Sequence, residues 1–146
     1  MKRLTFGEHF NQPLEQVAWP GLETLTLGSA FNQSLEQVAL PSGLNSLTFG
    51  ESFNHSLERV ALPDGLQNLV FGQNFNQSLV RVTLPRGLKS LTFGDRFSES
   101  LQRVALPEGL EDLTLGKKLK NSSLEKVTLP KSLRRLACGS LVLSTL

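Results

Sequence analysis

Residues 44–65 read LNSLTFGESFNHSLERVALPDG, and this stretch decides the fold. It has two similar halves, L-x-x-L-x-F-G and L-x-x-V-x-L-P, in which apolar and polar residues alternate over a few positions. Such alternation predicts short strands, because successive side chains of a strand point to opposite faces. Gly50 and Gly65 allow positive φ and Pro63 removes a backbone donor, so we expect each half to end in a corner. The stretch therefore predicts one coil that contains two short strands.

The same unit recurs along the whole chain of 146 residues. The motif L-x-x-G begins at residues 4, 25, 47, 69, 91, 113 and 136, with spacings of 21, 22, 22, 22, 22 and 23 residues. Regular repeats of this length are typical of solenoids, in which each repeat packs only against its neighbours. We expect a single repeat array over residues 1–146, with six coils and a partial seventh at 136–146.

Stacking of these coils would bring equivalent segments side by side. The L-T-F segments should then form one parallel sheet and the V-A-L segments a second, with leucine, valine and phenylalanine side chains between the two. The sequence thus predicts a mainly β solenoid of 22-residue coils with two short parallel sheets.

A phenylalanine–asparagine motif follows the glycine in most repeats. It reads FNQP at 10–13, FNQS at 31–34, FNHS at 53–56 and FNQS at 75–78, and it drifts to FSES at 97–100 and LKNSS at 119–123. Together with the LTFG and LP-x-x-L elements, this motif resembles the FNIP repeat, a leucine-rich-repeat-like unit named for its Phe-Asn-Ile-Pro core. The similarity to BspA-type leucine-rich repeats is weaker. The resemblance implies a leucine-rich-repeat-like fold and a role as an interaction scaffold.

Two residue series are expected to be structural. The asparagines of the motif should point inward at a corner and bond to backbone groups of their own and the next coil. They are Asn11, Asn32, Asn54 and Asn76, with Asn121 shifted by one position. The phenylalanines should stack in the core, in one series at 10, 31, 53, 75 and 97 and a second at 6, 49, 71 and 93. Trp19 stands where later coils have leucine, so we expect it in the core as well.

The outward positions of the expected second sheet are the candidate partner-binding site. They are Arg59, Arg81, Arg103 and Lys126, one per coil. This row of cations would suit a protein partner of acidic character. Neighbouring glutamates such as Glu58 leave open a different interpretation, a solvated face whose charges neutralise one another.

The outward positions of the first sheet are mostly threonine and serine. Paired threonines such as Thr24 and Thr26 loosely resemble the ranks of ice-binding solenoids, but Asn68, Val70 and Asp112 interrupt them. Threonine also suits exposed strand positions in general. Plain solvent exposure is therefore the preferred interpretation of this face.

Charge is distributed unevenly along the chain. Residues 1–73 carry 3 basic and 7 acidic side chains, a net charge of −4, and residues 74–146 carry 12 and 6, a net charge of +6. Neither end shows a capping helix, although the closing segment 136–146 could fold over the last coil as a lid. Open edges of opposite charge favour an alternative function, a structural solenoid that associates end to end.

Several function classes have little support in the sequence. No nucleophile with a base, metal-ligand cluster or phosphate-binding loop occurs, so we expect neither an enzyme nor a cofactor or metal site. Cys138 is the single cysteine and no apolar run is long enough to span a membrane, which indicates a cytoplasmic protein. Nucleic acid is not the expected partner, because the basic residues near the C-terminus lack interleaved exposed aromatics and a known motif.

Overall fold

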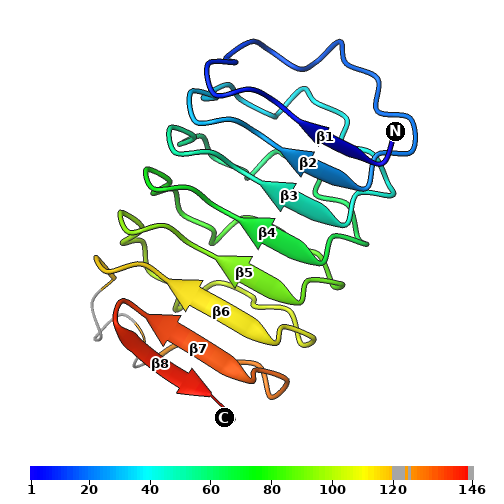
Figure 1. Cartoon of the computed structure of the whole chain (residues 1–146). Coiled ribbons are helices and arrows are strands. Elements are labelled where there is room, and N and C mark those ends of the chain that lie inside the picture. The colour runs from blue at the N-terminus through cyan, green and yellow to red at the C-terminus, as the bar shows by residue number, and fades with distance from the viewer. Residues whose placement is uncertain (120–123, 125, 145–146) are drawn as a thin grey trace.

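The protein is a stack of coils with one continuous sheet along one side (Figure 1). The computed structural model describes residues 1–119, 124 and 126–144. The strands are β1 Arg3–Thr5, β2 Thr24–Thr26, β3 Ser46–Thr48, β4 Asn68–Val70, β5 Ser90–Thr92, β6 Asp112–Leu115, β7 Arg135–Cys138 and β8 Leu141–Ser144. Strands β1 to β7 pair in parallel and in chain order, and β8 pairs antiparallel with β7. No helix occurs in this part of the chain, so the expected mainly β solenoid of 22-residue coils is confirmed.

The register of the sheet advances by one repeat at each strand. Leu47 of β3 lies opposite Leu25 of β2 and Leu69 of β4, and all three side chains are fully buried. The residues on either side of each leucine point outward and are partly exposed, as for Ser46 and Thr48. The alternation in the sequence therefore corresponds to the inward and outward faces of this sheet.

The expected second sheet does not form in the described residues, where the V-A-L segments follow tight turns. In each coil a valine N–H donates to the carbonyl of the leucine three residues earlier, for example Val60 to Leu57 at 3.0 Å. Where serine precedes that leucine, its hydroxyl accepts the N–H two residues on, as Ser56 does from Glu58 at 3.2 Å. These local bonds turn the chain, and the proline that follows has no N–H to offer a neighbouring coil. We call these turns the outer turns; they comprise residues 14–17, 35–38, 57–60, 79–82 and 101–104, together with residues 124, 126 and 127.

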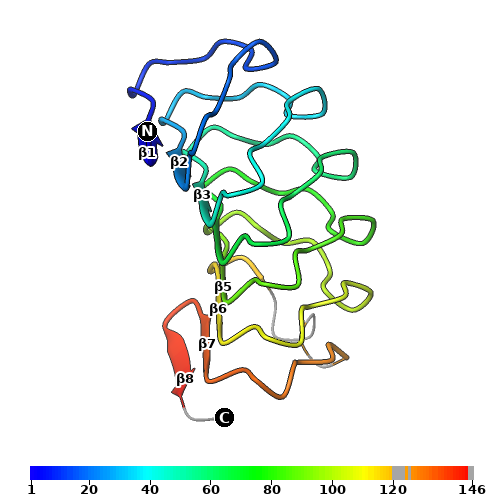
Figure 2. The same cartoon turned by 90° about the vertical axis from the view of Figure 1, so that its right-hand side faces the viewer.

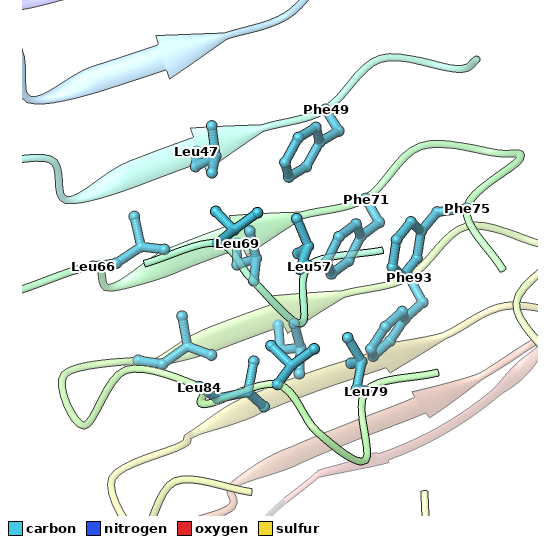
Figure 3. Packing of buried hydrophobic residues seen from close by; sticks show 14 of the residues in the cluster. Leu47, Phe49, Leu57, Leu66, Leu69, Phe71, Phe75, Leu79, Leu84 and Phe93 are labelled. Atoms are coloured by element: carbon cyan, nitrogen blue, oxygen red, sulfur yellow. The ribbon is translucent and has the colours of Figure 1, made fainter. Parts of the chain in front are cut away.

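Two columns of phenylalanine rings and the inward leucines fill the space within the coils (Figure 3). The rings of Phe71 and Phe75 stack within one coil with centroids 3.9 Å apart. Phe31, Phe53, Phe75 and Phe97 have no exposed surface at all. Trp19 is 8% exposed and packs edge-on against Phe6. The predicted core is thus confirmed.

The spacing between coils grows with distance from the sheet. Neighbouring strands lie about 4.8 Å apart. Ring centroids in the column that follows the strands, Phe49, Phe71 and Phe93, are 5.3 and 5.4 Å apart, and those in the second column are 6.1 to 6.3 Å apart. The coils therefore spread away from the sheet, which lies on the narrower side of the stack (Figure 2).

The glycines that follow strands β2 to β6 are required by close packing and not by positive φ. Only Gly21 and Gly139 among the described glycines have positive φ, at 67° and 61°. A Cβ added to Gly50 would overlap the carbonyl oxygen of Gly28 in the preceding coil, and the same holds for Gly72, Gly94 and Gly116. Gly139, the last glycine of this column, is an exception, because it has positive φ and its nearest neighbouring atom would lie 3.8 Å away. Gly65 has open space around it, and neither Gly50 nor Gly65 uses the positive φ that glycine allows. The expected corners are present, because turns lie at residues 51–52 and 64–65. The backbones of successive coils approach closely at the glycines after strands β2 to β6, and this approach leaves no room for a side chain there.

The asparagines form a ladder between coils, but they do so at the surface. The side-chain carbonyl of each asparagine accepts the backbone N–H of the equivalent residue in the next coil, at 2.8 to 3.0 Å. The four bonds join Asn11 to Asn32, Asn32 to Asn54, Asn54 to Asn76 and Asn76 to Ser98. The expected bond to the next coil is confirmed, whereas the inward direction was wrong, since Asn11, Asn32 and Asn54 are exposed. Asn121 lies outside the described residues.

The closing segment extends the sheet instead of covering the last coil. Strand β8 pairs with β7 through Cys138↔Leu141, Ala137↔Val142 and Leu136↔Leu143. Leu141, Val142 and Leu143 remain 57%, 50% and 42% exposed. The expected lid over the core is therefore replaced by an added edge strand.

Candidate functional site

The predicted binding residues occupy equivalent places on successive outer turns. Arg59, Arg81, Arg103 and Lys126 each directly precede the valine that closes an outer turn, and all four are exposed. Every outer turn closes with the same hydrogen bond, and these turns follow one another along the side of the stack away from the sheet (Figure 2). The four cations therefore occupy equivalent backbone positions in one row. The structure brings these residues together as expected, but on turns instead of strands.

Ion pairs within the described part of the chain lie elsewhere. They are Lys2–Glu23 at 3.2 Å, Lys89–Glu111 at 3.3 Å and Lys117–Asp95 at 3.9 Å, and each joins two neighbouring coils. None includes Arg59, Arg81 or Arg103, although Glu58 precedes Arg59 in the chain. These three guanidinium groups are therefore available to an external carboxylate.

The row changes in character along the stack. Glu58 precedes Arg59, whereas Val80 precedes Arg81 and Gln102 precedes Arg103. Val80 is 44% exposed, so an apolar side chain lies next to Arg81 in the same turn. The part of the row around Arg81 and Arg103 thus combines positive charge with apolar surface and has no acidic neighbour within its own turn.

The sheet face offers a different kind of surface. Strands β2 to β5 present only small, uncharged side chains outward: Thr24, Thr26, Ser46, Thr48, Asn68, Val70, Ser90 and Thr92. Charge enters at β6 and β7, where Asp112 lies opposite Arg135 and the Arg135 guanidinium donates to the Thr114 hydroxyl at 3.3 Å. This face has fewer long or charged side chains with which to hold a partner.

Sites for chemistry are scarce in the described residues. No group of three or more histidine, cysteine, aspartate or glutamate side chains could hold a metal ion there. Hollows beside Pro107 and Pro130 are lined by neither histidine nor cysteine. A further hollow beside Gly139 is lined by Cys138 without a histidine or a carboxylate. The same part of the chain has no helix that could cross a membrane. The row on the outer turns is the strongest candidate site.

One surface was missed by sequence reasoning. Leu141, Val142 and Leu143 were assigned to a lid, yet they form an exposed, uncharged edge strand. The signal was available, because a run of apolar residues without the glycine and phenylalanine of the repeat does not fit a further coil.

Comparison with known proteins identifies the repeat. The family model described as FNIP Repeat matches residues 20–52, 31–74, 53–85 and 75–118. Among solved structures, the chain is similar to "The crystal structure of CroV588 a novel circular LRR protein structure", with 28% sequence identity and a TM-score of 0.58. That alignment covers 95% of this chain and 27% of the other, so the chain spans about a quarter of that protein's length. No curated protein matches the chain.

Proposed function

Since the chain belongs to the FNIP repeat family, we propose that it is a non-catalytic repeat scaffold that binds an acidic protein partner through the outer turns. The observation that carries this proposal is the row of exposed cations, one per coil, of which Arg59, Arg81 and Arg103 take part in no ion pair in the described residues. A cytoplasmic location, consistent with the single Cys138, belongs to the same proposal.

The stack supplies the rigidity that such binding needs. The outer turns are fixed by their own hydrogen bonds, and the phenylalanine columns beneath them hold successive coils at constant spacing. A partner therefore meets cations whose backbone positions are set before binding, so less conformational entropy is lost. Arginine suits this role because its planar guanidinium can bind a carboxylate through two parallel hydrogen bonds.

Charge reversal in the row tests the proposal. The probe is a fluorescein-labelled peptide of twenty glutamates, and the measurement is its fluorescence anisotropy during titration with the protein. We expect the double variant Arg81→Glu/Arg103→Glu to bind the peptide roughly tenfold more weakly or worse, because attraction becomes repulsion at the contact.

A matched control separates the row from net charge. Arg86 and Arg96 are also exposed and outside the ion pairs of the described residues, but they lie away from the outer turns. The variant Arg86→Glu/Arg96→Glu has the same net charge as the test variant and should retain most of the binding. Equal losses in the two variants, or no loss in either, would count against the outer turns as the binding site.

A further inference from the structure

The N-terminal coil has the packing surface of an interior coil on a side that no described residue covers. Phe6 and Phe10 stack at 4.2 Å, as equivalent pairs do in later coils, yet both remain partly exposed, whereas Phe31 and Phe53 have no exposed surface. A Cβ placed on Gly7 would meet no atom within 4 Å, although the preceding coil leaves no room for a Cβ at the next five glycines of the column, Gly28 to Gly116. Coil 1 therefore presents a surface suited to a further strand or coil.

The edge of β1 on this side has free backbone groups. The Phe6 N–H donates to Thr26 at 2.9 Å and the Lys2 carbonyl accepts from Thr24 at 2.9 Å, so these residues face β2. Backbone groups alternate in direction along a strand, and those of Arg3 and Thr5 consequently point away from β2. They are available to pair with another strand.

The other end of the sheet carries a strand suited to this edge. Strand β8 contains no charged residue, and its Leu141, Val142 and Leu143 are about half exposed. Natural edge strands are usually protected from pairing by charges, prolines or bulges, and β8 has no charge or proline. Because β8 runs antiparallel to β1–β7, it would meet β1 of a molecule stacked in the same sense as an antiparallel pair.

We propose that β8 of one molecule pairs with the free edge of β1 in a second copy, so that copies associate head to tail. The first half of the chain carries a net charge of −4 and the second half +6, so head-to-tail order brings halves of opposite charge next to each other. Residues 1–20, which form the contacting coil, carry two basic and two acidic side chains, so this attraction acts at longer range than the contact itself. Leu141 and Leu143, which pair with the inward residues Cys138 and Leu136, would cover Phe6 and Phe10 of the next copy. Such a contact is heterologous, and it leads to rings or open chains instead of closed two-fold dimers.

Molar mass by multi-angle light scattering over a concentration series tests this association. We expect the 16.1 kDa chain to grow in average mass with concentration at 0.1 M salt. At 1 M salt the growth should decrease, because the screening length falls from about 10 Å to about 3 Å. A monomer at every concentration and both salt concentrations would overturn the proposal.

Two variants block one end each. Thr5→Pro removes an N–H that points away from β2, so it should stop pairing at β1 while keeping the bonds between β1 and β2. Val142→Glu places a charge on the exposed edge strand β8 and should weaken association roughly tenfold or more. Val70→Glu, at an outward and partly exposed valine of β4 in the middle of the stack, is the matched control and should associate like the parent chain.

Mixing the two blocked variants shows which ends meet. Thr5→Pro retains an intact β8 and Val142→Glu retains an intact β1, so an equimolar mixture should form dimers at a concentration at which each variant alone is monomeric. Fluorescence of the single Trp19 verifies that both are folded. If Thr5→Pro associates as well as the parent chain, or if the mixture remains monomeric while the parent chain associates, pairing of β8 with β1 is wrong.

Discussion

At the scale of single residues, the glycines after strands β2 to β6 have the most stringent requirement in the repeat, because they leave no room for a side chain. A methyl group on Gly72 would overlap the carbonyl of Gly50, whereas one on Gly65 would lie 4.0 Å from its nearest neighbour, the Ser42 carbonyl. We expect Gly72→Ala to lower the free energy of unfolding by about 1 to 3 kcal/mol or more, because rigid backbone must move. Gly65→Ala should be neutral or stabilising by about 0.4 to 1 kcal/mol, since it restricts the unfolded chain. Urea titrations of both variants, followed by Trp19 fluorescence, compare them directly, and equal losses would contradict the close approach of the coils.

At the scale of elements, the asparagine ladder ties each coil to the next outside the sheet. The Asn54 side-chain carbonyl accepts the Asn76 N–H at 2.9 Å and the Gln77 amide at 3.1 Å. Asn54→Ala leaves that backbone N–H without its partner, so we expect a loss of about 1 to 2 kcal/mol in the free energy of unfolding. Asn54→Asp keeps an acceptor and should lose less. Asn68→Ala, at an exposed asparagine on β4, is the control for thermal or urea unfolding, and a loss equal to that of Asn54→Ala would show that the ladder contributes no stability.

The elements also show where sequence reasoning succeeds and where it stops. The L-T-F and V-A-L segments have the same alternation, so pattern alone predicts two sheets. Only the structure shows that the Ser56 hydroxyl accepts the Glu58 N–H and that the Val60 N–H donates to the Leu57 carbonyl. These two bonds close a turn, so the second segment is a loop. The row of Arg59, Arg81 and Arg103 was still predictable, because repeat spacing brings equivalent residues together whether they lie on strands or on turns. The antiparallel pairing of β8 with β7 was not predictable, since residues 141–144 lie outside the repeat pattern.

At the scale of the whole molecule, each coil contacts only its neighbours, so the number of coils should be adjustable. Deletion of residues 47–68 joins Ser46 to Leu69, and the strand, glycine and phenylalanine positions of the remaining coils stay in register. We expect this shortened chain to unfold cooperatively, with a urea m-value lower by about one-seventh, because m scales with the surface exposed on unfolding. Deletion of residues 47–57 places Glu58 and Arg59 where β3 should continue, and it should abolish cooperative unfolding. Circular dichroism and Trp19 fluorescence during urea titration measure both chains, and equal disruption by the two deletions would mean that stability depends on the array as a unit and not on contacts between neighbouring coils.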